Sequence, residues 1–256
     1  MSRLRIRAVA AALAAALVLA GTVATGTAPA QAASAKDPVI VVNGLLGVGF
    51  AYDPLVARLR ADGYQVWDFE LPTLGTQDIH LSARALNTFA DGVRARTGAA
   101  KVDLVGHSEG GLVSRTYVKY YGGADEVDSL VTLGTPNYGT VAANIVRVFT
   151  LGTCVGITAC QQMTIGSAFL ADLNAGDDSI GAVVYTNLAT VFDELVQPYT
   201  NSYLNAGDGN ITNRSLQSQC WLRVIGHLGL IVDGAVYSGV QDALEKRPIS
   251  FDCFAL

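Results

Sequence analysis

Short apolar segments alternate with longer amphipathic segments along most of the chain, beginning at Pro38. The short segments are apolar almost throughout, which is typical of strands buried on both faces. The longer segments repeat apolar residues every three or four positions, which is typical of helices that cover a core. We predict strands at Val39–Val42, Tyr64–Leu71, Lys101–Val105, Ser129–Leu133, Val183–Leu188 and Trp221–Ile225. We predict helices at Tyr52–Arg60, Ile79–Arg96 (N-capped by Asp78), Glu109–Tyr121 and Gly234–Glu245.

This order of elements predicts an α/β fold, with a mainly parallel central sheet flanked by helices on both faces. Residues 36–256 are expected to form one domain. Residues 137–180 interrupt the alternation, so we expect a cap-like or lid-like insertion there. Within it, Val141–Leu151 is strongly apolar and either lines a cleft as a lid or packs into the core as a helix.

Residues 1–35 have the features of a secretory signal peptide. Three arginines come first, Ala8–Ala20 is an unbroken run of thirteen apolar residues, and Ala-x-Ala patterns follow. A membrane anchor is the alternative, but this run is shorter than the ~20 residues that span a bilayer. We therefore expect cleavage near residues 30–35 and a secreted, extracellular protein.

Charge and cysteine content narrow the class of partner. The sequence has 17 basic and 22 acidic residues, and without the three arginines of residues 1–35 the balance is 14 against 22, a net charge of −8. This charge argues against nucleic acid or an anionic membrane as a standing partner.

The sequence has four cysteines: Cys154, Cys160, Cys220 and Cys253. They are expected to pair in an exported chain, and three pairings are possible. Their spacing lacks the CxxC and HxxxH forms of a zinc site, so we expect no metal.

The candidate nucleophile is Ser108, in the G-x-S-x-G motif Gly106-His-Ser-Glu-Gly110. A predicted strand leads into the motif and a predicted helix leaves it, as a nucleophile elbow requires. Such a turn exposes the hydroxyl above the sheet, and it needs small residues two positions before and after the serine. Gly106 and Gly110 meet this need.

The candidate general base follows from the count of three histidines. His107 lies inside the elbow, where its side chain points away from the neighbouring hydroxyl. His80 precedes the nucleophile, whereas in a fold with this elbow the order is serine, acid, histidine. His227 remains, in a loop between the predicted strand Trp221–Ile225 and the last helix.

The candidate acid lies between the serine and the histidine, soon after a strand. Asp193 follows the predicted strand Val183–Leu188 within a few residues. Glu194 is adjacent and is the first rival. Asp208 is a second, although its Asn/Gly-rich surroundings favour a turn.

Two backbone N–H groups are needed to stabilise the oxyanion that forms when the serine attacks. One is expected from Glu109, directly after the nucleophile, with only its backbone used. The other is expected from the loop after an early strand, and Leu45, in Asn43-Gly-Leu-Leu-Gly47, is the candidate.

Several of these segments resemble the bacterial extracellular lipases. The similarity lies in the elbow Gly106–Gly111, in Leu133-Gly-Thr-Pro136 and in Val41-Val-Asn-Gly-Leu45. In those lipases His-Gly usually stands at Asn43-Gly44, and Met or Gln at Glu109.

The C-terminal half is similar to the lipase B of yeast, both in Phe192–Pro198 and in the order of elements between Cys220 and Cys253. The resemblance runs from about Pro38 to Cys253. It implies a class 2 lipase of the α/β-hydrolase fold, a Ser108–Asp193–His227 triad, a Cys220–Cys253 disulfide and no cofactor. We expect Cys154–Cys160 as the second sequence-local pair.

Residues and resemblance together predict a serine hydrolase, a triacylglycerol lipase or carboxylesterase, that cleaves esters with an apolar acyl group through an acyl-enzyme. The expected partner is an ester or lipid substrate, with transient contact to a lipid–water interface, and we expect a monomer. The same triad could serve a cutinase-like polyesterase, a phospholipase A-type enzyme or an acyltransferase, because these differ in what enters the pocket. A non-catalytic binding module would be expected to lose triad residues, and all three are present.

Overall fold

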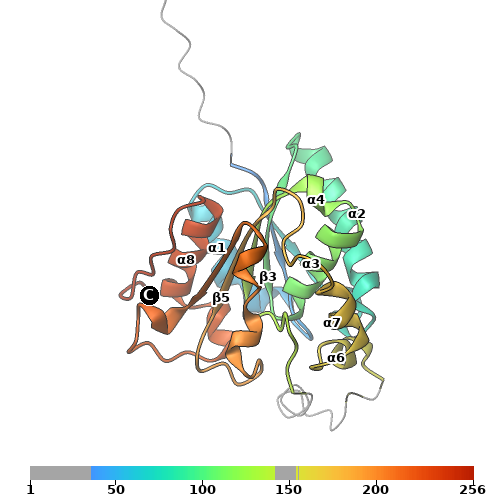
Figure 1. The fold of residues 1–256 in the computed structure, drawn as a ribbon. Helices are drawn as coiled ribbons and strands as arrows, with labels where there is room; N and C mark the ends of the chain where they lie inside the picture. Colours follow the sequence, from blue (N-terminus) through green and yellow to red (C-terminus); the bar gives the residue numbers. More distant parts are fainter. Residues whose placement is uncertain (1–35, 142–153, 155) are drawn as a thin grey trace, which may run out of the picture. The chain divides into compact units, whose positions relative to one another are not determined.

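Six parallel strands form a single sheet in the computed structural model, which describes residues 36–141, 154 and 156–256 (Figure 1). The order across the sheet is β2-β1-β3-β4-β5-β6, and every neighbouring pair is parallel. The strands are β1 (Val39–Val42), β2 (Val66–Phe69), β3 (Val102–His107), β4 (Val127–Leu133), β5 (Val184–Ala189) and β6 (Ile211–Ser215). This sheet confirms the predicted fold class. The expected signal peptide and all of Val141–Leu151 except its first residue lie outside the described residues.

One predicted strand is wrong. Trp221–Ile225 forms an irregular loop, and the sixth strand is the more polar segment Ile211–Ser215. The edge position explains the polar sequence, because only one side of β6 pairs with a neighbouring strand. The apolar residues of the loop are not core residues either: Trp221 is 75% exposed and Leu222 is 74% exposed.

Helices cover both faces of the sheet (Figure 1). One face carries α1 and α8, and the other carries α2, α3 and the shorter helices. The helices are α1 (Asp53–Ala61), α2 (Ile79–Thr97), α3 (Glu109–Tyr120), α4 (Gly123–Glu126), α6 (Thr158–Gln162), α7 (Ala168–Leu173) and α8 (Gly234–Leu244). Short 3-10 segments lie at Gly49–Tyr52, Pro72–Gly75, Tyr199–Ser202, Ala206–Asp208, Leu216–Ser218 and His227–Ile231. None of the helices in the described part of the chain is long and apolar enough to cross a membrane.

Local signals in the sequence account for the ends of the longer helices. Asp78 caps α2 by accepting a hydrogen bond from the His80 N–H at 2.7 Å, as predicted. Gly98 ends the same helix with a φ of 73°, a conformation that favours glycine. Asp233 caps α8 through the N–H groups of Ala235 and Val236.

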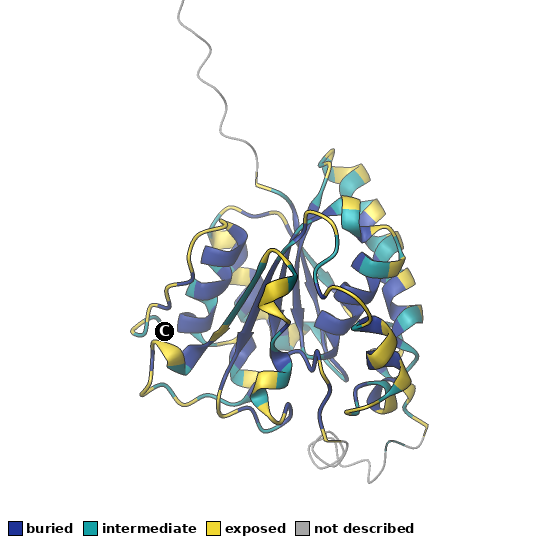
Figure 2. Cartoon of the chain, in the orientation of Figure 1, coloured by how far each residue is buried: buried dark blue, intermediate teal, exposed yellow. Residues whose placement is uncertain are grey.

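The core lies in two layers, one on each face of the sheet, and the strands between them are almost completely buried (Figure 2). Alternate residues of β3 serve the two layers: Leu104 packs in the layer under α2 and α3, and Val105 in the layer under α1 and α8. This double burial explains why the central strands are apolar throughout.

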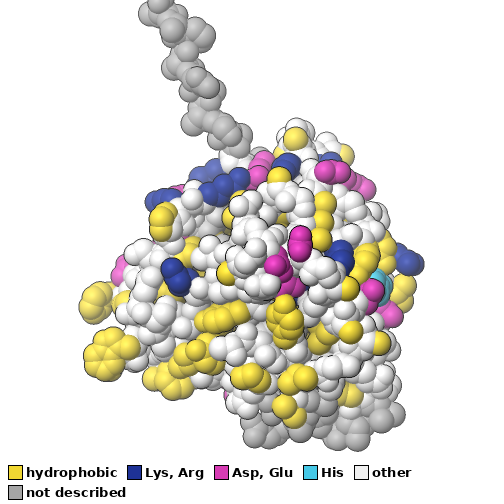
Figure 3. All heavy atoms as spheres, viewed as in Figure 1, with side chains coloured by type: hydrophobic (Ala, Val, Ile, Leu, Met, Phe, Trp, Pro, Cys, Tyr) yellow, Lys and Arg dark blue, Asp and Glu magenta, His cyan; other side chains and the backbone are white. Residues whose placement is uncertain are grey.

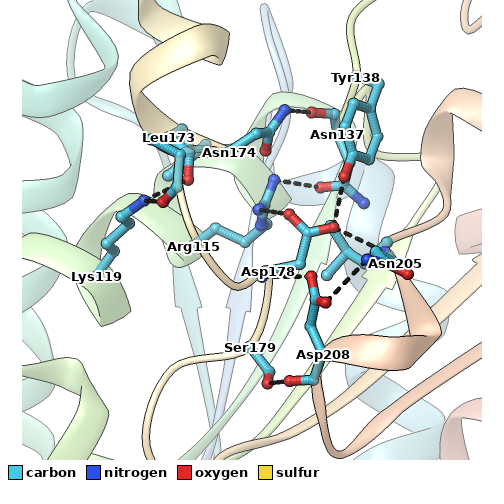
Figure 4. Close-up of polar contacts among 12 residues, drawn as sticks. Arg115, Lys119, Asn137, Tyr138, Leu173, Asn174, Asp178, Ser179, Asn205 and Asp208 are labelled. Atoms are coloured by element: carbon cyan, nitrogen blue, oxygen red, sulfur yellow. Dashed lines mark hydrogen bonds and ion pairs between the residues drawn. The ribbon is translucent and has the colours of Figure 1, made fainter.

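A buried ion pair ties α3 to the segment after α7 (Figure 4). The Arg115 guanidinium donates to Asp178 at 3.2 Å and to the Asn137 side chain at 3.3 Å. The other oxygen of Asp178 accepts from the Tyr138 hydroxyl at 2.6 Å and the Asn205 N–H at 2.7 Å. Because every oxygen of the buried carboxylate is bonded, the network fixes the backbone that follows β4 at Asn137 and Tyr138.

The cysteines form Cys154–Cys160 and Cys220–Cys253, the two expected sequence-local pairs. The second disulfide joins the loop after β6 to the chain beyond α8, and the loop that it closes contains His227.

Removing the Cys220–Cys253 disulfide is expected to destabilise the fold more than removing the other. The chain-entropy model gives roughly 3.8 kcal/mol for the longer loop and roughly 2.3 kcal/mol for the Cys154–Cys160 loop, before any native strain. Urea denaturation of the two double variants, Cys220→Ser/Cys253→Ser and Cys154→Ser/Cys160→Ser, measures both losses. A larger loss from the shorter loop would contradict this ranking.

Candidate active site

The candidate site lies at the carboxyl ends of the strands, where neighbouring loops diverge. The chain leaves β1 toward β2 on one side, and β3 lies on the other side of β1. This change of direction opens a crevice between the loops after β1 and β3, the usual position of a ligand site in an open parallel sheet. Asn43 begins the loop after β1, and Ser108 begins the turn after β3.

Ser108 occupies a strained turn between β3 and α3. Its φ of 54° and ψ of −125° are rare for a residue with a side chain. The close packing around the turn explains the flanking glycines: a Cβ on Gly106 would lie 2.7 Å from the Gly111 nitrogen, and one on Gly110 would clash with the Val42 oxygen. The local geometry is that of a nucleophile elbow.

Asp193 and His227 form a buried pair beside this turn. The His227 Nδ1 lies 2.8 Å from an Asp193 carboxylate oxygen, and both side chains are at most 1% exposed. The other Asp193 oxygen accepts from the N–H groups of Leu195 and Val196, at 2.9 and 2.7 Å. Gly134 leaves room for the pair, because a Cβ there would lie 3.0 Å from the Asp193 carboxylate.

The two rival acids have other partners. Glu194 accepts the backbone N–H of His227 at 2.9 Å and so holds the histidine loop without facing the imidazole. Asp208 lies in the short turn at Ala206–Asp208, where it accepts from the Asn205 side chain and the Asp178 N–H (Figure 4). Sequence reasoning did not foresee the Glu194 contact, and no pattern in the sequence signals it.

Ser108 and His227 line the same cavity, which has a volume of about 190 Å³. The His227 Nε2 atom is buried and has no hydrogen-bond partner among the described residues. The remaining lining is mostly apolar, with Leu45, Val48, Leu195, Leu228 and Ile231 among its members. A second hollow at Ser108 is lined by Leu45, Pro136, Thr140, Met163, Leu195 and Val196.

In the loop after β1, most N–H groups have an acceptor within the described structure and that of Leu45 does not. Gly44 donates to the Tyr52 hydroxyl, Leu46 to the Leu74 carbonyl and Gly47 to the Gly44 carbonyl. The Leu45 N–H has no acceptor among the residues that the structure describes, and Leu45 lines both hollows at Ser108.

The other two histidines lie outside the Asp193–His227 pair. His80, on α2, contacts the Tyr121 hydroxyl at 3.0 Å. His107 is buried, with its Nδ1 3.0 Å from the Tyr52 hydroxyl and its ring centroid 4.7 Å from that of His227. Burial lowers the pKa of His107 well below its ordinary value, and His227 adds to this effect, so the imidazole is neutral.

The side chain of Glu109 is fully buried, and neither carboxyl oxygen has a hydrogen-bond partner among the described residues. It points toward Gly75, where a Cβ would lie 2.5 Å from one of these oxygens. Burial raises the pKa of Glu109 well above its ordinary value, and no cation in the described part of the chain compensates for the lost hydration. The carboxyl therefore stays protonated where an exposed glutamate is ionised.

We expect the burial of Glu109 to make the stability of the fold depend on pH. The variant Glu109→Gln should remove this dependence. Above the ordinary glutamate pKa the unfolded chain releases the Glu109 proton and the folded chain keeps it, so folded-state stability falls as pH rises toward the raised pKa. Glutamine is neutral in both states. The Tm of Glu109→Gln should equal that of the wild type near pH 4 and exceed it near pH 8, by roughly 2–4 °C per kcal/mol. Calorimetry across this range measures the difference, and a constant difference would contradict the burial argument.

A carboxylate cluster lies at the opposite end of the sheet. Asp37, Asp103 and Asp128 each offer an oxygen within 4.8 Å of the others. Burial raises the pKa of Asp103 to about 7, and the charges of Asp37 and Asp128 add to the shift. Lys246 already pairs with Asp128 at 2.5 Å. These residues are near the amino ends of β3 and β4, so they do not belong to the site at Ser108.

Exposed apolar side chains flank His227 along the chain. Figure 3 shows hydrophobic side chains gathered beside and below the C-terminal end. A surface hollow of about 450 Å³ is lined by Trp221, Leu222 and Phe254. Leu228 is 60% exposed, and it also lines the cavity at Ser108. Leu228 therefore places an exposed apolar side chain at the rim of the candidate site.

The parallel sheet and the strained serine between β3 and α3 define an α/β-hydrolase fold. Solved structures agree: lipase B of Aspergillus fumigatus has a TM-score of 0.72 at 20% identity, covering 85% of this chain and 54% of that one. The mature lipase BlEst2 of Bacillus licheniformis has a TM-score of 0.66 at 20% identity, covering 83% and 93%.

The model of the family Lipase (class 2) matches residues 36–235, and the chain belongs to this family, as the resemblance predicted. A triacylglycerol lipase of Burkholderia plantarii is 31% identical, in an alignment that covers 81% of this chain and 61% of that protein. Lipase B of Pseudozyma antarctica is 27% identical, over 89% of this chain and 66% of that protein. The chain thus spans less than two thirds of the length of these relatives.

Proposed function

We propose that this chain hydrolyses carboxylic esters through an acyl-enzyme on Ser108, with His227 as general base and Asp193 as its orienting acid. The observation that carries the proposal is the buried Asp193–His227 pair at 2.8 Å, next to a serine in an elbow conformation that lines the same cavity. Membership of the class 2 lipases and the triacylglycerol lipases among the relatives support the reaction class.

The hydrogen bond to Asp193 decides which nitrogen of His227 takes part in proton transfer. A carboxylate only accepts, so Nδ1 carries the proton and Nε2 carries the lone pair. Nε2 takes the Ser108 proton as the serine oxygen attacks the acyl carbon. It then gives this proton to the leaving alcohol. Water repeats the sequence and releases the acid, while Asp193 stabilises the imidazolium in both halves.

The oxyanion is stabilised by two backbone donors, the Leu45 N–H and the Glu109 N–H. The first has no acceptor among the described residues, and the second lies at the amino end of α3, where N–H groups have no helical partner. The partial positive charge of this helix end favours the same negative oxygen.

The alcohol part of the substrate lies on the side of His227, because this residue must protonate it. The apolar lining of both hollows at Ser108 favours an apolar ester. Met163 and Val196 line the hollow that His227 does not line, and Leu195 lines both. The exposed apolar residues around His227 favour a substrate presented at a lipid–water surface.

We also propose that the protein is exported. The pattern of residues 1–35 supports this, and so do the two disulfides, which persist in oxidising compartments. Whole-cell fractionation with detection of the 36–256 fragment outside the cell tests it.

A fluorophosphonate probe tests the activated serine directly. Native protein should be labelled on the peptide that contains Ser108, and heat-unfolded protein should not be labelled. In parallel, p-nitrophenyl esters of increasing acyl length and emulsified triglycerides should release acid. Absence of both labelling and hydrolysis would overturn the proposal, and labelling without hydrolysis of any ester would overturn the substrate class.

A further inference from the structure

We propose that Tyr52 is a positioning residue whose hydroxyl holds the oxyanion loop in place and links it, through His107, to the loop of the general base. This inference rests on the proposed function, because it concerns how the same reaction is organised. Sequence reasoning missed Tyr52, which precedes α1 and lies 56 positions before the nucleophile.

The Tyr52 hydroxyl lies between two segments of the candidate site. It accepts the Gly44 N–H at 2.8 Å, and it lies 3.0 Å from the His107 Nδ1. The side chain is 2% exposed, so water does not compete for these contacts. Gly44 directly precedes Leu45, the proposed oxyanion donor, and His107 directly precedes Ser108.

Counting protons gives the direction of each bond in this chain. A backbone N–H can only donate, so the Tyr52 oxygen accepts from Gly44. The His107 Nε2 faces the His227 carbonyl oxygen at 3.4 Å, and a carbonyl can only accept, so the proton of the neutral imidazole lies on Nε2. The Nδ1 therefore accepts, and the Tyr52 hydroxyl donates its proton to it. The chain runs from the oxyanion loop to the backbone of the general base.

Tyr52 and His107, the two side chains in this series of hydrogen bonds, each keep one protonation state near neutral pH. Burial raises the pKa of Tyr52 far above its ordinary value, so the hydroxyl does not ionise. The lowered pKa of His107 keeps its Nδ1 available as an acceptor. The arrangement is thus part of the resting structure and does not switch with pH.

The hydrogen bond from Gly44 sets the orientation of the loop. A Cβ on Gly44 would lie 2.9 Å from the Ser108 Cβ, and one on Gly47 would lie 2.9 Å from the Tyr52 hydroxyl oxygen. The loop therefore packs against both the nucleophile and the tyrosine. Removing the hydroxyl leaves the buried Gly44 N–H without an acceptor, and the loop can rotate to find another. Such a rotation turns the neighbouring Leu45 N–H away from the position of the oxyanion.

Tyr52→Phe tests this role, because it removes the hydroxyl and keeps the ring that lines the cavity. We expect kcat to fall on the order of 10–100-fold, with little change in KM, since misplacing a catalytic group by ~1 Å costs up to about 10²-fold. Tyr185→Phe is the matched control. Tyr185 is also buried, and its hydroxyl also accepts a backbone N–H, that of Ile180, away from the site. Its removal should lower the Tm without lowering kcat.

Two further measurements separate positioning from a general loss of stability. A boronic acid inhibitor, which forms a tetrahedral adduct on the serine, should bind more weakly to Tyr52→Phe by the factor lost in kcat/KM. The loss should be equal for esters of different alcohols, because the hydroxyl acts through Gly44 and not on the leaving group. A loss that depends on the alcohol would assign Tyr52 to substrate binding and overturn the proposal.

Nitrogen-15 NMR of the wild type gives a test that no variant can confuse. The sequence has only three histidines, so each imidazole can be resolved. His107 should show an unprotonated Nδ1 and a protonated Nε2. The opposite tautomer, or equal kcat in Tyr52→Phe and Tyr185→Phe, would overturn the inference while the wild type still hydrolyses esters. A wild type without esterase activity would instead refute the proposed function.

Discussion

Replacing Ser108 with alanine is expected to lower kcat for ester hydrolysis by about 10⁶-fold, the loss found when the serine of an equivalent triad is removed. The proposed nucleophile is the hydroxyl of the elbow residue, and alanine has no hydroxyl to replace it. The fold should persist, since alanine keeps the Cβ that packs against Gly44 and adopts the same φ of 54° at the same cost. Hydrolysis of p-nitrophenyl esters measures the loss, with circular dichroism as the check on folding.

Ser114→Ala is the matched control for this experiment. Ser114 lies on α3, the helix that follows the elbow. It is fully buried, and its hydroxyl donates to the Gly110 carbonyl at 2.7 Å. Its replacement removes a buried hydroxyl close to the elbow without touching the nucleophile, so kcat should stay within a few-fold of the wild type. Activity of Ser108→Ala close to that of Ser114→Ala would refute the serine mechanism.

The strands that could be predicted from the sequence are those in the middle of the sheet, where both faces are buried. β1, β3 and β4 are buried on both faces, so their apolar runs mark them clearly. β6 could not be found this way, because an edge strand such as Ile211–Ser215 has a polar sequence. The apolar Trp221–Ile225 was mistaken for a strand because exposed apolar residues near a site give the same pattern as buried ones.

The site residues differ in how much the sequence can say about them. Ser108 and His227 could be proposed from local motif and chain order, which the fold imposes. Asp193 could be proposed from its place after a strand and from the resemblance, but the sequence leaves the neighbouring Glu194 as a rival, because adjacent carboxylates differ only in direction. The contact of Tyr52 with His107 and that of Glu194 with His227 were missed because they join segments that are distant in sequence.

The adjacent carboxylates Asp193 and Glu194 give the second large expected effect. Asp193→Asn should lower kcat on the order of 10⁴-fold, as in the serine-protease triad. The asparagine oxygen can still accept from the Leu195 and Val196 N–H groups, which directs the amide nitrogen toward His227. This nitrogen can only donate, so the His227 Nδ1 must accept and the proton moves to Nε2. The imidazole then has no lone pair for the Ser108 proton.

Glu194→Gln is the matched control for Asp193→Asn, because it makes the same chemical change one residue away. In the wild type the Glu194 carboxylate accepts the His227 backbone N–H at 2.9 Å. A glutamine retains an oxygen that can accept this N–H, so the histidine loop should keep its position. The expected loss in kcat is below about 10-fold, in line with the modest value of one exchanged hydrogen bond. Steady-state kinetics of both variants at one pH measure the two losses. If Glu194→Gln lost more activity than Asp193→Asn, the acid would be Glu194, and the Asp193–His227 contact would be structural.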